Sequence, residues 1–92
     1  MNSVFKALSH PVRRAVLRML RDGPRTAGEL AGAFDVSKPT MSGHFTVLKD
    51  AGLIMAEREG TTIHYRLNTS VAEDAAALLL DLAGGGKDGD TS

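Results

Sequence analysis

Apolar residues in the first third of the chain recur with the spacing of an amphipathic helix. Over residues 11–21 they are three or four positions apart and therefore share one helix face. These residues are Val12, Val16, Met19 and Leu20. Pro11 suits the first turn because its missing N–H has no partner there, and Gly23 and Pro24 then end the helix. A shorter apolar repeat predicts a preceding helix over residues 2–8.

Two more helices are predicted on either side of a short turn. Thr26 and Glu29 have the spacing of a capping box, in which the threonine caps the helix and the glutamate bonds back to it. After the turn at residues 35–36, Ser37 is the predicted N-cap of a helix that continues to Ala51. The inward faces of the two helices consist of Ala27, Leu30, Ala31 and Phe34, and of Met41, Phe45 and Leu48. Two helices joined by such a short turn form a helix-turn-helix.

The pattern then changes from a helical period to alternation. Residues 54–58 and 61–67 predict the two strands of a β-hairpin, with Gly60 in the turn. Apolar and polar residues alternate along the second strand, so one face is buried and the other is in water. The apolar set is Ile63, Tyr65 and Leu67, and the polar set is Thr62, His64 and Arg66.

A last helix begins near Ser70, which has the spacing of a second capping box with Glu73. It is apolar around more than half of its circumference, because Ala76, Ala77 and Leu80 add apolar surface on faces other than the main one. A helix of this kind near a chain end usually packs on a partner. We therefore predict a twofold homodimer. Its predicted interface residues are Val4, Phe5, Leu8, Val71, Ala75, Leu78, Leu79 and Leu82.

These elements predict a mainly α (α+β) fold: a winged helix-turn-helix with about five helices and a two-stranded β-hairpin as the wing. The 92 residues leave room for one domain, which we place at residues 1–83. A domain this short is marginally stable alone, which favours a subunit interface. The glycine-rich, polar segment 84–92 is predicted to be a disordered tail.

The sequence contains no cysteine, which excludes disulfides, thiolate metal sites and thiol redox sensing. No apolar run approaches the ~18 residues of a membrane span, and no signal-peptide core is present. We therefore expect a cytoplasmic protein that does not insert into membranes. The sequence also lacks a glycine-rich phosphate loop and a serine, histidine and carboxylate set that its periodicity brings together. We expect neither an enzyme nor a bound cofactor.

Charge is distributed unevenly, although the formal net charge is zero. Residues 1–66 contain ten Lys and Arg against six Asp and Glu, a net charge of +4. Residues 67–92 contain one Lys against five acids, a net charge of −4. A basic binding face with an acidic remote end would produce this asymmetry. The alternative is chance in a short chain.

The outer face of the second helix of the helix-turn-helix carries short polar side chains, which would let it sit deep in a DNA major groove. Serine and threonine can bond to base edges and phosphates, and a threonine methyl can touch that of thymine. Lys38 lies at the helix N-terminus, where backbone N–H groups also attract phosphate. Arg58 on the hairpin is placed for the DNA backbone or the minor groove. The predicted DNA-binding residues are Ser37, Lys38, Pro39, Thr40, Ser42, Gly43, His44, Thr46, Lys49, Arg58 and Thr61.

Each of these features has an ordinary structural alternative. A polar helix face can simply be solvated, and Arg58 can pair with Glu57 or Glu59. His44 is expected on the helix surface as a phosphate contact, and His64 is expected to be exposed on the wing. The three histidines lie on three different predicted elements, whereas a divalent-metal site needs several convergent ligands. No metal site is therefore expected.

Several motifs in order along the chain carry a family resemblance. They are the run Phe-Lys-Ala-Leu-Ser-His-Pro-Val-Arg-Arg at 5–14, the segments 42–45 and 47–53, and Tyr-Arg-Leu-Asn at 65–68. These motifs resemble those of the ArsR/SmtB family of winged-helix repressors, over about residues 2–82. Within that family the sequence is most similar to the SdpR-like branch of short autorepressors. The resemblance implies a dimer formed by the first and last helices, repression of a small operon, and release by an effector.

Three positions depart from the family pattern. His10 stands where Asp is usual, and because Asp is the better N-cap, Ser9 is the alternative cap. Gly43 replaces a longer polar side chain that could contact a base, and Phe45 replaces Leu in the core. Metal-sensing members carry a cysteine pair before the turn, or histidines and carboxylates on the last helix. Here residues 29–33 are Glu-Leu-Ala-Gly-Ala and the last helix has no histidine, so metal sensing is not expected.

We therefore predict a sequence-specific transcriptional repressor that binds an inverted repeat in double-stranded DNA as a homodimer. Two recognition helices related by a twofold axis predict half-sites about one helical turn apart. The effector stays open between a small molecule bound between subunits, a sequestering protein, and none. The alternative function is a winged-helix protein–protein interaction module without sequence-specific DNA binding.

Overall fold

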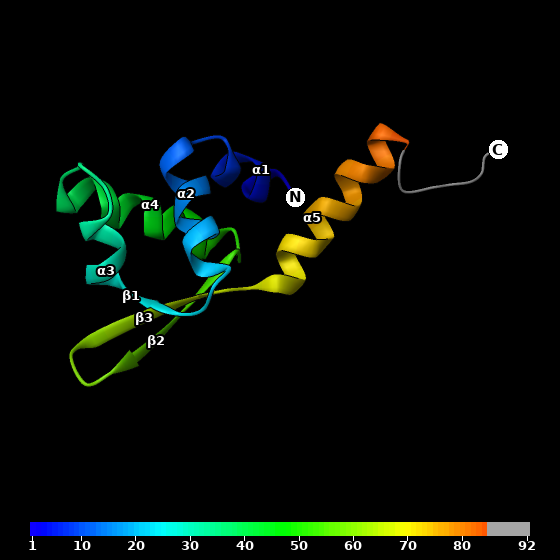
Figure 1. Cartoon of the computed structure of the whole chain (residues 1–92). Helices are drawn as coiled ribbons and strands as arrows, with labels where there is room; N and C mark the ends of the chain where they lie inside the picture. The colour runs from blue at the N-terminus through cyan, green and yellow to red at the C-terminus, as the bar shows by residue number, and fades with distance from the viewer. Residues whose placement is uncertain (85–92) are drawn as a thin grey trace.

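The computed structural model describes residues 1–84, which form a helical body, a small antiparallel sheet and a projecting last helix (Figure 1). The helices are α1 (Asn2–Leu8), α2 (Pro11–Leu20), α3 (Ala27–Gly32), α4 (Lys38–Asp50) and α5 (Thr69–Ala83). The strands are β1 (Arg25–Thr26), β2 (Ile54–Glu59) and β3 (Thr62–Leu67). The predicted winged helix-turn-helix is confirmed, with α3 and α4 as the helix-turn-helix and β2 and β3 as the wing. Apart from Gly84, the predicted tail lies outside the described residues.

Two helices of the helix-turn-helix begin at the predicted caps. In the capping box before α3, the Glu29 N–H donates to Thr26 Oγ1 at 3.0 Å and the Thr26 N–H donates to Glu29 Oε1 at 2.8 Å. Hydrogen bonding by the Thr26 backbone, and to a lesser extent by its side chain, holds the pKa of Glu29 below its usual value. Ser37 caps α4 by accepting a hydrogen bond from the Thr40 N–H at 3.3 Å.

The cap of α2 is His10 rather than the alternative, Ser9. His10 Nδ1 accepts a hydrogen bond from the Val12 N–H at 3.1 Å. His10 has the extended backbone that an N-cap requires (φ −115°, ψ 131°), whereas Ser9 is in the helical region at the end of α1. Ser9 instead donates its hydroxyl to the Lys6 carbonyl at 2.6 Å. Backbone conformation therefore assigns the two neighbours to different helices.

The predicted capping box of Ser70 and Glu73 is wrong, because α5 begins earlier. Asn68 is its N-cap, with Oδ1 accepting a hydrogen bond from the Val71 N–H at 3.5 Å. The N–H of Asn68 donates to the Leu53 carbonyl at 2.8 Å. This bond fixes the chain as it leaves β3, so that helical geometry starts at the next residue and Ser70 lies inside the first turn.

The wing is the outer part of a sheet with strand order β1-β3-β2. Strands β2 and β3 pair antiparallel along their whole length. Gly60 turns the chain between them with φ 64°, a left-handed conformation that glycine adopts without strain. Strand β1 was not predicted, because its two residues are too few to show an alternating pattern.

The core lies between α4, the other helices of the body and the sheet. The predicted inward residues of α4 are buried, and Phe45 stacks on Tyr65 of β3 with ring centroids 4.8 Å apart. The largest fully buried side chains are Leu30, Met41, Leu48, Leu53 and Val16. Burying each such side chain contributes about 1.5–3 kcal/mol. Because this face anchors α4, its opposite face lies at the surface.

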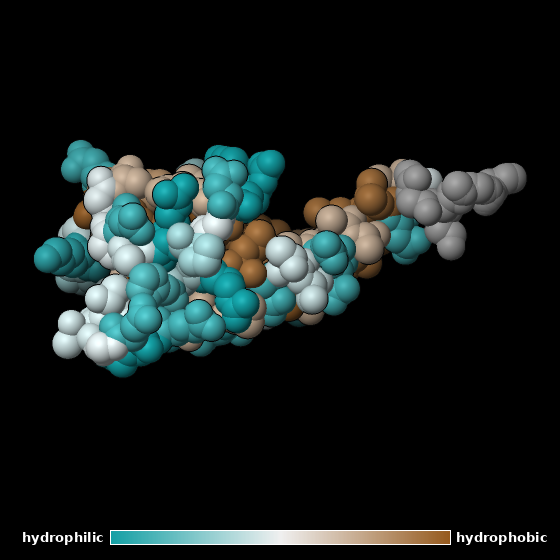
Figure 2. All heavy atoms as spheres, turned by 60° about the horizontal axis from the view of Figure 1, so that its bottom comes forward, coloured by the Kyte–Doolittle hydropathy of each residue, from teal (hydrophilic) through white to brown (hydrophobic). Residues whose placement is uncertain are grey.

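Helix α5 packs on the body mainly through its first turns and then projects away (Figure 1). Ala75 is buried, whereas the exposed fractions of Leu79, Leu80 and Leu82 are 51, 54 and 72%. Figure 2 shows hydrophobic side chains gathered along this projecting helix. An apolar groove of about 280 Å³ lies between α2 and α5. The helix therefore presents more apolar surface than the subunit covers.

Candidate nucleic-acid interface

The outer face of α4 is a row of short, exposed side chains. Of the predicted DNA-binding residues, those exposed are Ser37, Lys38, Pro39, Thr40, Ser42, Gly43, Thr46 and Lys49 on or beside α4, and Arg58 and Thr61 on the wing. A Cβ placed on Gly43 would meet no atom within 4 Å, so the helix backbone itself is accessible there. The row offers hydrogen-bonding groups with little bulk, which is the property that close approach to a groove requires.

The N-terminus of α4 combines a fixed cap with exposed charge. Ser37 Oγ accepts from the Thr40 N–H and donates to Thr40 Oγ1 at 2.9 Å, so the Thr40 hydroxyl keeps its own proton for an outside acceptor. Lys38 lies in the first turn and contributes its ammonium group and its own N–H, because Pro39 has no N–H and the Thr40 N–H is bonded to Ser37. Cationic and N–H donors at one helix end form an attractive site for a phosphate group.

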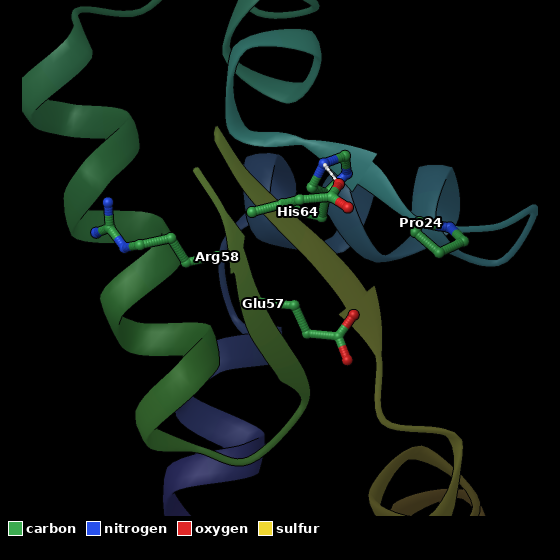
Figure 3. A pocket seen from close by; sticks show the side chains of 5 residues that line it. Pro24, Glu57, Arg58 and His64 are labelled. Carbon is green, nitrogen blue, oxygen red and sulfur yellow. Dashed lines mark ion pairs between the residues drawn. The ribbon is translucent and has the colours of Figure 1, made fainter. Parts of the chain in front are cut away.

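The two faces of the wing differ in charge because successive strand residues point to opposite sides. Arg58 pairs with Ile63 on the face that also carries Tyr65, and the stack of Tyr65 on Phe45 shows that this face lies toward α4. Glu57 pairs across the strands with His64 on the other face. In Figure 3, Arg58 extends to the side nearest α4, and Glu57 and His64 extend away from it.

The acidic residues of the wing form ion pairs on the face opposite to that of Arg58. Arg66 Nη2 lies 3.4 Å from Glu57 Oε2, and His64 Nε2 lies 3.5 Å from Glu59 Oε1. The alternative in which Arg58 pairs with Glu57 or Glu59 is therefore wrong, since adjacent strand residues face opposite ways. Within residues 1–84, Arg58 forms no ion pair. His64, which was expected to be exposed, has 35% of its side chain exposed and is partnered.

His44 was predicted to lie on the DNA-facing surface, and that prediction is wrong. Only 8% of it is exposed. It follows Met41 by three positions and precedes Leu48 by four, so it borders the inward stripe and faces the N-terminal helices. There its Nδ1 lies 3.1 Å from Arg13 Nη1, and its ring centroid lies 4.4 Å from that of His10. Burial, aided by the charges of His10 and Arg13, lowers the pKa of His44 from its usual 6.5.

Comparisons with known proteins agree with this geometry. A model of a helix-turn-helix domain family matches residues 8–57. The chain is 46% identical over 81 residues to the transcriptional repressor SdpR of Bacillus subtilis, covering 88% of this chain and 90% of SdpR. It is 38% identical over 78 residues to the biofilm growth-associated repressor of Agrobacterium fabrum, covering 85% of this chain and 63% of that protein.

A solved ArsR family transcriptional regulator has the same architecture. It superposes with a TM-score of 0.84 at 34% identity, covering 90% of this chain and 91% of that protein. This chain belongs to the ArsR family. The resemblance found in its sequence motifs is thus confirmed, and family membership makes the chain a transcriptional regulator rather than an enzyme.

The predicted interface residues of this ArsR-family chain fall into two groups. Val4 and Ala75 are 5% and 4% exposed, so they stabilise the subunit rather than offer surface to a partner. The others are partly or fully exposed, namely Phe5, Leu8, Val71, Leu78, Leu79 and Leu82. Leu80 was not in the predicted set, although it is 54% exposed. It lies on a different side of α5 from the predicted interface residues. Its apolar side chain was the feature of the sequence that could have identified it as an interface residue.

Within residues 1–84, no three His, Cys, Asp or Glu side chains converge in a way that could hold a metal ion. His10 and His44 are neighbours, but the Nδ1 atom of each is already engaged, by Val12 and Arg13 respectively. No helix of the described ArsR-family chain is long and apolar enough to cross a bilayer.

Proposed function

We propose that the protein is a sequence-specific transcriptional repressor that binds an inverted repeat in double-stranded DNA as a homodimer. The observation that carries the proposal is the shared orientation of two surfaces. The exposed polar row of α4 and the unpaired Arg58 belong to different elements, and the face of the wing that carries Arg58 lies toward α4. A duplex could contact both at once.

In this proposal α4 is the recognition helix and enters the major groove. Ser42 and Thr46 would contact base edges, each good contact contributing about 1–3 kcal/mol of discrimination. Lys38 would bind a phosphate beside the helix N-terminus. Arg58 and Thr61 would lie along the backbone or in the minor groove. Major-groove base contacts are thereby assigned to the middle of α4, and phosphate contacts to its N-terminus and to the wing.

The charge distribution is consistent with the proposal despite the net charge of zero. Glu57 and Glu59 lie on the wing face that points away from α4, where they pair with Arg66 and His64. The acids of α5 are on the projecting helix. The acids of the wing and of α5 are therefore kept from the proposed DNA surface, which lowers their repulsion of phosphates.

Homodimerisation is supported by the exposed leucines of α5. Leu79, Leu80 and Leu82 are each more than half exposed, next to an apolar groove against α2. Contiguous apolar surface of this kind marks an interaction site. We infer that α1 and α5 form the twofold interface, which would present two recognition helices to half-sites about one helical turn apart.

Repression is inferred from the names of the relatives, SdpR and the biofilm growth-associated repressor. A protein that regulates transcription in this way would act in the cytoplasm on chromosomal DNA. The signal that releases it is proposed to be a small molecule bound between subunits or a sequestering protein.

Selection of genomic fragments by the purified protein tests the proposal. Fragments from the source genome are bound at moderate salt, recovered and sequenced, with Arg58→Ala as a weakened comparison and Arg66→Ala as the matched control. Enrichment of one inverted repeat supports a sequence-specific repressor. A folded dimer that enriches no sequence contradicts the proposal and favours the protein–protein interaction module.

A further inference from the structure

Arg13 of α2 joins three segments of the subunit through one guanidinium group. Its Nε donates to the Ala7 carbonyl at 2.7 Å and its Nη2 donates to the Lys6 carbonyl at 3.1 Å, both at the C-terminal end of α1. Its Nη1 lies 3.1 Å from His44 Nδ1 in the middle of α4. One side chain therefore ties the end of α1 and the recognition helix to α2.

Hydrogen-bond chemistry fixes the form of the His44 ring. Arginine has five N–H donors and no acceptor, so His44 Nδ1 accepts the bond from Arg13 and carries no proton. His10 is fixed in the same way, because its Nδ1 accepts the Val12 N–H as the cap of α2. The two rings are tilted by 49° with centroids 4.4 Å apart. The His44 ring is thus neutral, with its proton on Nε2.

The bond to His44 is directional, unlike the other contacts that hold α4. Apart from His44, the inward stripe of α4 is apolar, and the hydrophobic effect that holds it is non-directional. A hydrogen bond weakens steeply when its angle or length departs from the preferred range. Ser42, Gly43 and Thr46 lie within two residues of His44 but on the exposed outer face of α4. Any rotation of the helix that strains the Arg13–His44 bond therefore also moves the proposed base contacts.

We propose that His44 and Arg13 are positioning residues that set the orientation of the recognition helix relative to α1. The proposal rests on the proposed function, in which α1 and α5 form the dimer and α4 enters the major groove. In a twofold complex, the separation of the two α4 helices depends on how rigidly each is held to the interface helices. The Arg13–His44 pair is a directional part of that connection and does not touch DNA.

The test compares variants that keep or lose the hydrogen-bond acceptor of His44, and a variant that loses the guanidinium of Arg13, which donates to Ala7, Lys6 and His44. His44→Leu fills the space without accepting, whereas His44→Asn retains an oxygen acceptor near the Nδ1 position. Arg13→Lys keeps the charge but lacks the planar fork. Arg14→Lys is the matched control, because Arg14 bonds to the Leu8 carbonyl of α1 at 2.9 Å and has no bond to α4.

Each variant is titrated with the selected operator, with the same operator lengthened by one base pair between half-sites, and with random duplex. His44→Leu and Arg13→Lys are expected to lose about tenfold in operator affinity. Their affinity for random duplex should stay within about twofold of that of the unchanged protein. Both variants should also lose much of their discrimination against the operator with the longer spacer. His44→Asn should restore most of this loss, and Arg14→Lys should match the unchanged protein.

Thermal melting and sedimentation establish that each variant is a folded dimer, and His44→Asn and Arg13→Lys keep the test decisive when His44→Leu does not fold. Folded dimers of His44→Leu and Arg13→Lys with unchanged operator affinity and spacer discrimination overturn the proposal. Equal losses on operator and random duplex overturn it as well. An unchanged protein that selects no operator refutes the proposed function itself, which is a distinct result.

Discussion

Arg58 and Arg66 project from opposite faces of the same hairpin. Arg58 shares the face of Tyr65, which lies toward α4, whereas Arg66 is paired with Glu57 on the other face. Both are exposed. The wing thus contains two exposed arginines, one on each strand, that differ in the surface they serve, which gives the DNA-binding proposal an internal control.

Arg58→Ala is expected to weaken binding to the operator and to random duplex by the same factor. Loss of one phosphate contact should lower the slope of log affinity against log salt by about 0.9. Titrations over a salt series with both duplexes measure this. Arg66→Ala should leave affinity and slope unchanged, and a larger effect of Arg66→Ala than of Arg58→Ala would show that the wing faces are assigned the wrong way round.

Ser42→Ala is expected to weaken operator binding more than random binding, by up to about tenfold, because a hydroxyl that contacts a base edge contributes to discrimination. Ser42 is exposed in the middle of the outer face of α4. Competition titrations give the ratio of operator to random affinity. Ser70→Ala, an exposed serine in the first turn of α5, is the control, and a lowered ratio in that variant would contradict the assignment.

Gly43→Ala is expected to raise the free energy of unfolding by about 0.5–1 kcal/mol, because glycine is unfavourable inside a helix. Apart from the backbone of α4 and the adjacent residues, the new Cβ has no atom within 4 Å. Urea denaturation measures the change. Gly52→Ala is the comparison and should be destabilising, since φ at Gly52 is 77° and an L-residue is strained there. Shifts of the same sign in both variants would contradict this account.

Local sequence patterns were sufficient to predict most of the fold. The helix-turn-helix follows from Ser37, from the Thr26–Glu29 box and from an inward stripe, all of which act within a few residues. The caps at His10 and Asn68 were not predicted. Asn68 begins α5 because its N–H bonds to the Leu53 carbonyl, a contact between distant segments that no local pattern contains.

The candidate site divides in the same way. The exposed row of α4 could be predicted as the complement of its apolar stripe. The burial of His44 could not, because it depends on Arg13, 31 positions away in the sequence. The free state of Arg58 required the strand register, which decides that Glu57 and Arg58 face opposite sides. Sequence periodicity thus identifies the buried and exposed faces of a helix or strand. Tertiary contacts decide whether a residue at the edge of the buried face, such as His44, is itself buried.

The stability of the subunit is expected to fall as the pH drops below about 6.5. Burial, with the charges of His10 and Arg13, lowers the pKa of His44, so the unfolded state takes up a proton more readily than the folded state. This contribution is fully present above the unfolded pKa and is lost as the pH falls from there through the lower folded-state pKa. The slope is at most about 1.4 kcal/mol per pH unit.

Urea denaturation at a series of pH values, with His44→Asn as the comparison, measures this contribution. The unchanged protein should lose stability on acidification in the stated window, and His44→Asn should lack that part of the slope. Equal slopes in the two proteins would assign the acid sensitivity to groups other than His44.

Leu82→Asp is expected to dissociate the proposed dimer, because Leu82 is 72% exposed in the subunit and a buried charge without a partner is strongly unfavourable at an interface. Ala77→Asp places the same charge on the polar side of α5, between Glu73 and Asp81, and should leave the dimer intact. Sedimentation gives the dissociation constant, expected to rise more than about tenfold for Leu82→Asp alone. Operator affinity should fall with it, because a monomer contacts one half-site. A Leu82→Asp protein that stays dimeric would move the interface away from the end of α5.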